Sequence, residues 1–169
     1  MGRRDRPRAV APLLLAALLA GSLGALRGRG PEAFSVDPGA QAPLRALWAA
    51  SVAARAERVA CLASVEDGDT VRLIRILPLD AGADSMAVSA RVSLETCGPP
   101  EWQGTVHTHI ALSEHQRPYA QFSGADRGIM LMWWQRWKRD GTFCLLYAEN
   151  EAHCEIDGSR VVILPSGRY

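Results

Sequence analysis

The chain has 169 residues, 48% of them hydrophobic, and a formal net charge of +1 at pH 7. This length accommodates one domain with its own core and a short additional segment. A net charge so close to zero gives no general argument for an acidic partner or for nucleic acid, and we expect no nucleic-acid partner.

Residues 1–30 differ in composition from the rest of the chain. Four arginines precede an uncharged run over residues 9–26: Arg3, Arg4, Arg6 and Arg8. A positive start followed by an apolar run of about eighteen residues is typical of a signal peptide or an N-terminal membrane anchor. The run slightly favours an anchor, and a buried helix is the less favoured alternative. The positive-inside rule then predicts a membrane-anchored or exported domain outside the cytoplasm.

The next segment separates this run from the predicted domain. Residues 27–42 are rich in Gly, Pro, Ala and Arg, and we interpret residues 31–42 as a linker that precedes a domain over residues 43–169. Apolar residues at helical spacing predict an amphipathic helix from Pro43 to about Ala56: Leu44, Leu47, Trp48 and Val52.

Strand patterns follow this helix. Asp-Gly at residues 67–68 lies between two apolar runs and predicts a hairpin of the strands Val59–Val65 and Val71–Leu77. A short strand is expected over residues 86–92, and a turn at residues 97–100. After residue 100, the sequence predicts a strand over Trp102–His109, a loop over 110–122 and a helix from Ser123 to about Arg139. Three short strands are predicted to follow: Thr142–Ala148, Ala152–Ile156 and Arg160–Leu164. This order predicts an α+β (α/β-like) domain with a mixed sheet.

Two short motifs suggest a metal site. His107 and His109 are two residues apart in a predicted strand, so their imidazoles project from the same face. Ser123 and Asp126 are three apart at a predicted helix start, which places both around the first turn. Two nitrogens and one carboxylate oxygen, with a fourth position open, are the ligand set of a catalytic zinc. The alternative is a capping box, which explains Ser123 and Asp126 without a metal.

These motifs also resemble a known family. The pattern His107-Thr108-His109 followed by Ser123-Gly124-Ala125-Asp126 resembles the signature of JAB/MPN (JAMM, Mov34/PAD-1) zinc metalloproteases. The segment 57–62, Glu-Arg-Val-Ala-Cys-Leu, resembles the upstream glutamate segment of that family, with alanine where glycine is usual. The resemblance covers roughly residues 43–157. The chain departs from the family at Ile110, where proline is usual, and in its longer loop over residues 110–122.

The resemblance implies a single MPN-type domain with a curved mixed sheet flanked by helices. It implies Zn²⁺ held by His107, His109 and Asp126, a proton carried by Glu57, and an oxyanion stabilised by Ser123. The implied reaction is hydrolysis of a peptide or isopeptide bond in a peptide or protein substrate, with a ubiquitin-like conjugate as one candidate. A non-catalytic MPN-like scaffold and a membrane-anchored binding domain without metal are the alternatives.

Other residues carry weaker signals. His115 in the long loop is a less favoured third ligand, and we expect His153 on an outer strand without a role. Cys144 and Cys154 flank a predicted turn, and both a disulfide and two half-buried thiols are compatible with that placement. A group of large side chains covers more than one face of the 123–139 helix, which favours core packing plus one exposed tryptophan over a partner or membrane surface: Met130, Met132, Trp133, Trp134 and Trp137.

Overall fold

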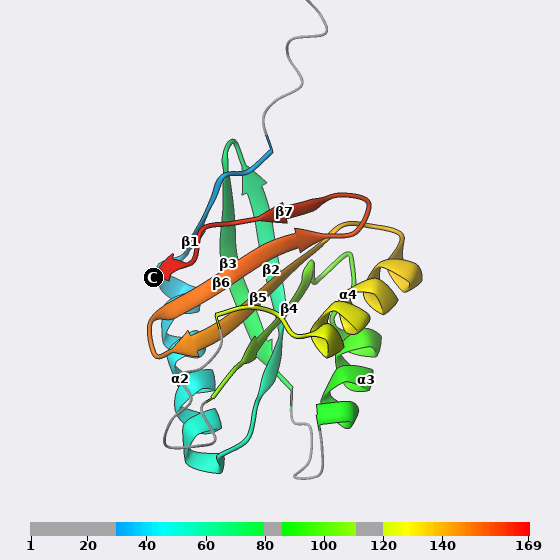
Figure 1. Ribbon diagram of the computed structural model, residues 1–169. Coiled ribbons are helices and arrows are strands. Elements are labelled where there is room, and N and C mark those ends of the chain that lie inside the picture. The colour runs from blue at the N-terminus through cyan, green and yellow to red at the C-terminus, as the bar shows by residue number, and fades with distance from the viewer. Residues whose placement is uncertain (1–29, 80–85, 111–119) are drawn as a thin grey trace, which may run out of the picture.

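The computed structural model describes residues 30–79, 86–110 and 120–169 (Figure 1). In chain order its elements are β1 (Ala33–Val36), α2 (Pro38–Ala54), β2 (Val59–Asp67), β3 (Thr70–Pro78), α3 (Met86–Thr96), β4 (Gly104–Thr108), α4 (Gly124–Trp137), β5 (Gly141–Ala148), β6 (Glu151–Asp157), β7 (Val161–Ile163) and β8 (Gly167–Arg168). The predicted N-terminal signal or anchor over residues 1–30 lies almost entirely outside the described residues. Within the described ranges, none of the helices has the length and apolar character needed to cross a membrane.

The strands form one mixed, curled sheet in the order β1-β3-β2-β4-β5-β6-β7, and β8 pairs with β6 beside this path. The pairs β1/β3 and β4/β5 are parallel, and the other pairs are antiparallel. The predicted β2/β3 hairpin is confirmed, with Gly68 in its turn at a positive φ of 64°. Mixed helix and strand content around such a sheet confirms the α+β class.

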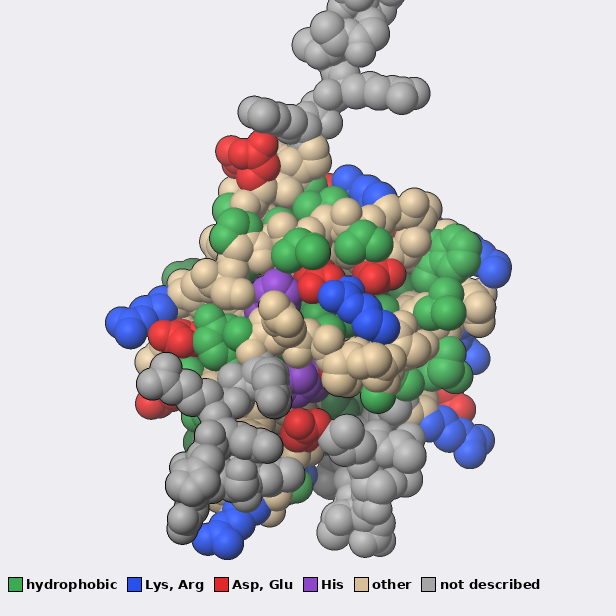
Figure 2. Space-filling model, viewed as in Figure 1, with side chains coloured by type: hydrophobic (Ala, Val, Ile, Leu, Met, Phe, Trp, Pro, Cys, Tyr) green, Lys and Arg blue, Asp and Glu red, His purple; other side chains and the backbone are tan. Residues whose placement is uncertain are grey.

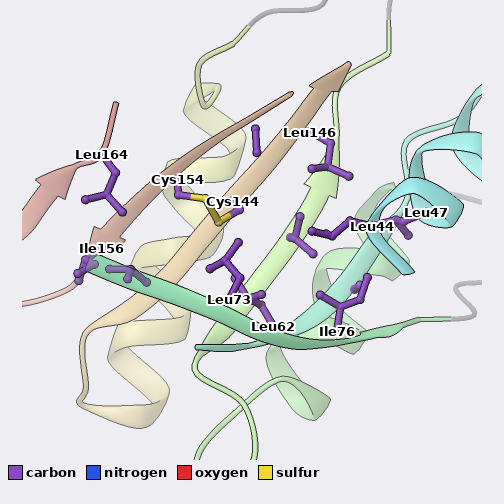
Figure 3. Close-up of a cluster of buried hydrophobic side chains, with 14 residues drawn as sticks. Leu44, Leu47, Leu62, Leu73, Ile76, Cys144, Leu146, Cys154, Ile156 and Leu164 are labelled. Carbon is purple, nitrogen blue, oxygen red and sulfur yellow. A yellow bond between two sulfur atoms is a disulfide. The ribbon is translucent and has the colours of Figure 1, made fainter. Parts of the chain in front are cut away.

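Alternate residues of the central strands face opposite sides of the sheet, as the two-residue period of a strand requires. Leu146 of β5 belongs to the core cluster that includes Leu44 and Leu47 of α2, shown in Figure 3. Leu145, its neighbour in sequence, belongs to a second cluster with Trp133 of α4. Figure 1 shows α2 on one side of the sheet and α3 and α4 on the other. The sheet therefore separates two cores, and the predicted site lies on the α4 side.

The segment interpreted as a linker, residues 31–42, contains strand β1 and the beginning of helix α2. Strand β1 pairs in parallel with β3, and the Asp37 amide donates to the Leu73 carbonyl at 2.9 Å. Pro38 is compatible with the helix because the N–H groups of a first helical turn need no partner within the helix. The folded part of the chain thus begins before residue 43, since a Pro/Gly-rich composition does not reveal pairing with a distant strand.

The short strand expected over residues 86–92 is also wrong, because these residues lie in helix α3. Ser93, Leu94 and Cys97 are buried, and their spacing of three and four residues matches one side of a helix. Leu94 joins the cluster around Trp133, and Cys97 forms a disulfide with Cys61 of β2. The burial of Ser93, Leu94 and Cys97 and the disulfide at Cys97 therefore outweigh the weak strand propensity of residues 86–92.

All four cysteines form disulfides, Cys61–Cys97 and Cys144–Cys154. Cys144 and Cys154 are register partners on the antiparallel strands β5 and β6, which resolves the open alternative in favour of a bridge. The Cys61–Cys97 bridge was not anticipated, because the sequence does not show that α3 packs against β2. It joins the end of α3 to the sheet on the side that carries α4.

The large side chains of α4 divide between the core and the surface. Trp133 and Met130 are buried, whereas Trp134 and Trp137 are half-buried and Met132 is exposed. Core packing therefore explains Trp133 and Met130, as the favoured interpretation predicts. No tryptophan of this helix is fully exposed, so the predicted exposed tryptophan is not found.

We expect the two disulfides to stabilise the fold unequally. Cys61–Cys97 spans 36 residues and Cys144–Cys154 spans 10, while all four cysteines are fully buried, so the effects of lost packing are comparable. Loop-closure entropy predicts a loss of about 4 kcal/mol for the Cys61→Ala/Cys97→Ala variant and about 3 kcal/mol for Cys144→Ala/Cys154→Ala. Urea unfolding measures both values. An equal or reversed order would contradict this explanation.

Candidate metal centre

Strand β4 places the two predicted histidines on the α4 side of the sheet. His107 is in register with Val59 of β2 and with Leu145 of β5. The strand ends at Thr108, yet the His109 amide still donates to the Leu146 carbonyl at 2.8 Å, so the alternation continues through His109. Both imidazoles consequently project from the same face, as predicted, and their side chains are only 16% and 13% exposed.

Helix α4 begins with a capping box, which the sequence offered as the alternative to a metal group. The Asp126 amide donates to the Ser123 hydroxyl at 3.2 Å, and the Ser123 amide donates to Asp126 Oδ2 at 2.6 Å. The same carboxylate faces the histidines, with Oδ1 3.3 Å from His107 Nε2 and Oδ2 3.5 Å from His109 Nε2. In the sequence the cap and the metal group are alternative explanations of Ser123 and Asp126, and the geometry accommodates both.

The three side chains form a group that could hold a metal ion. The two imidazole Nε2 atoms are 3.1 Å apart, and each faces a different oxygen of the Asp126 carboxylate, at 3.3 Å for His107 and at 3.5 Å for His109. Ligands about 2.05 Å from a tetrahedral zinc lie about 3.3 Å from one another, because the edge of a tetrahedron is about 1.63 times its radius. The spacing of the two nitrogens is close to this edge, and one ligand atom from each of the three residues lies within 4.8 Å of the others, so the group is compact enough to approach a zinc ion.

The protonation states of this group also suit a metal. Burial lowers the pKa of His107 to about 4, against the attraction of Asp126 and with the help of His109. Burial would raise the pKa of Asp126, but its hydrogen bonds with His109 and Ser123 and the charge of His107 hold that pKa well below its usual range. At neutral pH His107 is thus a neutral imidazole and Asp126 a carboxylate, which are the forms that bind metals.

Glu57 lies in the short connection between α2 and β2, close enough to the group for their charges to interact. Burial raises its pKa, while the charge of His109 lowers it and that of Asp126 raises it further. The connection is held by Thr108, whose hydroxyl lies 2.6 Å from the Ser51 hydroxyl and accepts from the Arg58 amide at 2.9 Å. Thr108 points away from its neighbouring histidines and attaches the Glu57 segment to their strand.

Sequence reasoning missed a second polar cluster beside this site. His153 is not a residue of an outer strand without a role, because it is buried and hydrogen-bonded to Glu155 at 2.8 Å. Arg127 of α4 binds the same carboxylate. The available signal was the alternation of His153, Glu155 and Asp157, which places three ionisable groups on one face of a strand. Figure 2 shows histidine, acidic and basic side chains close together on this face.

His115, the less favoured third ligand, and most of the long loop lie outside the described residues. The sequence matches no protein-family model and no curated protein.

Stability of the metal-free protein should fall between pH 7.5 and pH 5. The unfolded chain protonates His107 near pH 6.5, whereas the folded chain resists protonation until about pH 4. The unfolded state thus binds more protons in this range, and its linkage contributes a loss of about 2 kcal/mol in the free energy of unfolding. Urea unfolding at both pH values measures this loss of stability. In the His107→Gln variant the loss between the two pH values should be smaller by about 2 kcal/mol. An identical pH dependence in both proteins would contradict the shift.

Proposed function

We propose that the protein is a zinc-dependent hydrolase of the JAB/MPN (JAMM) type that cleaves a peptide or isopeptide bond. The observation that carries this proposal is the group of His107, His109 and Asp126, in which the two Nε2 atoms are 3.1 Å apart and the two carboxylate oxygens lie 3.3 and 3.5 Å from them. Two imidazoles and one carboxylate are ligands that zinc accepts, and three protein ligands leave one position for water or substrate.

Zinc in this site would supply a Lewis acid that makes water a better nucleophile and polarises the substrate carbonyl. The protein's own contribution begins with the ligands. His107 and Asp126 have the required protonation states at neutral pH before any metal binds. The capping hydrogen bonds and the β4 backbone hold these side chains in place, so little reorganisation is required on binding.

Glu57 is the proposed proton carrier. A general base works best when its pKa is close to the working pH, and burial moves the pKa of Glu57 in that direction. Its carboxylate would take a proton from the attacking water and deliver it to the nitrogen of the leaving amine. Glu57 is not one of the three residues of the metal group, although its charge interacts with His109 and Asp126, so we assign it proton transfer and not metal binding.

Ser123 is the proposed oxyanion donor. Its hydroxyl oxygen accepts the Asp126 amide hydrogen, so the hydroxyl hydrogen is free to rotate toward substrate. This side chain is exposed at the beginning of α4, next to the metal ligand Asp126. A hydrogen bond from it to the developing oxyanion would be strongest in the transition state and would therefore increase the rate.

The substrate is proposed to be an extracytoplasmic peptide or protein. Two buried disulfides are typical of domains that fold in oxidising compartments. The basic start and the apolar run over residues 9–26 support export or anchoring of the same domain. The metal-binding domain would then act outside the cytoplasm, as a secreted or membrane-anchored protein.

Elemental analysis of the purified protein should find about one zinc per chain. His109→Ala and Asp126→Ala each remove one ligand, and we expect both variants to lose the metal. Circular dichroism confirms that the variants remain folded. If the wild type binds no zinc after supplementation, the hydrolase proposal fails and Ser123 and Asp126 serve only as a helix cap.

Glu57→Gln should retain zinc but lose activity, because an amide cannot accept the proton from water. We expect kcat to fall by about 10²- to 10⁴-fold on a panel of fluorogenic peptides and isopeptide-linked substrates. Glu101→Gln is the matched control, since this exposed carboxylate lies before the opposite end of β4. Zinc binding without hydrolysis of any substrate by the wild type would instead favour the non-catalytic scaffold.

A further inference from the structure

A buried carboxylate on β6 connects the sheet to the helix that carries Asp126. Glu155 is 2% exposed and accepts two hydrogen bonds from the Arg127 guanidinium, one to each carboxylate oxygen, of which Nη2 to Oε1 measures 2.8 Å. His153 binds the same Oε1 at 2.8 Å, and Arg127 Nη1 also lies 3.4 Å from Asp157 Oδ2. A buried carboxylate requires such partners, because an unpaired charge away from water is strongly unfavourable.

Arg127 occupies the residue after Asp126, in the first turn of α4. Its amide donates to the Ser123 carbonyl at 3.1 Å, and the same turn contains the capping box. A bidentate guanidinium–carboxylate pair fixes direction as well as distance, because two parallel hydrogen bonds constrain the planar groups. The pair with Glu155 therefore sets the position of this turn relative to the sheet.

An aromatic ring extends the same connection to the histidines. Phe122 packs with its centroid 5.7 Å from the His107 ring and 5.6 Å from the His153 ring. The Arg127 guanidinium lies 5.4 Å from the same centroid. Phe122 is buried between these groups, so a shift of Arg127 would disturb the packing against His107 as well as the position of Asp126.

We propose that Arg127 and Glu155 are a positioning pair that holds Asp126 at the distance from β4 at which it shares a metal ion with His107 and His109. This inference rests on the proposed metal site. The tolerance for such a site is small, because metal–ligand distances vary by only about 0.2 Å. Loss of a residue that orients a ligand typically weakens metal affinity by about 10- to 100-fold.

The test measures zinc affinity and stability separately in the full-length chain. Arg127→Met/Glu155→Gln removes both charges, retains an oxygen acceptor for His153, and fills the space of the arginine stem. Arg160→Met is the matched control, because the Arg160 side chain is 41% exposed against 40% for Arg127, and it also binds two carboxylates. Arg160 follows the opposite end of β6 from the metal group.

We expect the zinc Kd of the double variant, measured by competition with a chromogenic chelator, to rise about 10- to 100-fold. Its cobalt(II) absorption spectrum should change, because Asp126 no longer binds in the same geometry. The control should retain the wild-type Kd and spectrum. Thermal unfolding of the metal-free proteins compares the stability of the double variant with that of the control. If Arg127 and Glu155 had a purely structural role, the double variant would lose stability but keep the wild-type cobalt spectrum.

Wild-type affinity and spectrum in the double variant would overturn the positioning role while the metal site stands. No zinc in the wild type would overturn both proposals, and this result appears before any substitution is made. If the double variant does not fold, Arg127→Lys takes its place. Lysine retains the charge but not the planar fork, so zinc binding should weaken, and unchanged binding would contradict the role of the bidentate pair.

Discussion

The Asp126 carboxylate is held from two sides by groups that are distant in the sequence. Its own helix supplies the Ser123 amide, and strand β4 supplies His107 and His109. A carboxylate with two oxygens can satisfy both, because each oxygen has two acceptor sites. Oδ2 accepts the cap, and Oδ1 faces His107. The beginning of α4 is thereby tied to β4, and the rest of the site depends on this arrangement.

Two further polar links support the site from opposite sides. On the α2 side of the sheet, Ser51 and Thr108 are fully buried and bind each other, and Thr108 also accepts the Arg58 amide that follows Glu57. On the α4 side, Arg127 binds Glu155 of β6. Buried hydrogen-bonding groups whose partners are satisfied make a structure rigid, because any displacement leaves a polar group unpaired. The segments that carry the candidate ligands and the proposed proton carrier are thus held by buried hydrogen bonds and have little freedom to move.

The protonation states of His107 and Asp126 both favour the binding of a cation. Burial keeps His107 neutral, and hydrogen bonds keep Asp126 ionised. The group accordingly presents the neutral imidazole of His107 and the negative carboxylate of Asp126 in a partly desolvated position. A cation at their centre would replace the hydration that these groups lost on folding. This preference supports the proposed metal.

The sequence by itself determined the features that depend on local periodicity: the His107/His109 face, the Ser123/Asp126 cap, and the β2/β3 hairpin. Alternation along a strand and spacing within one helical turn require no knowledge of distant residues. Tertiary structure alone decided that residues 86–96 form a helix, that β1 joins β3, and that Glu155 meets Arg127. Each of these depends on burial or pairing between segments far apart in the chain, which local patterns do not encode.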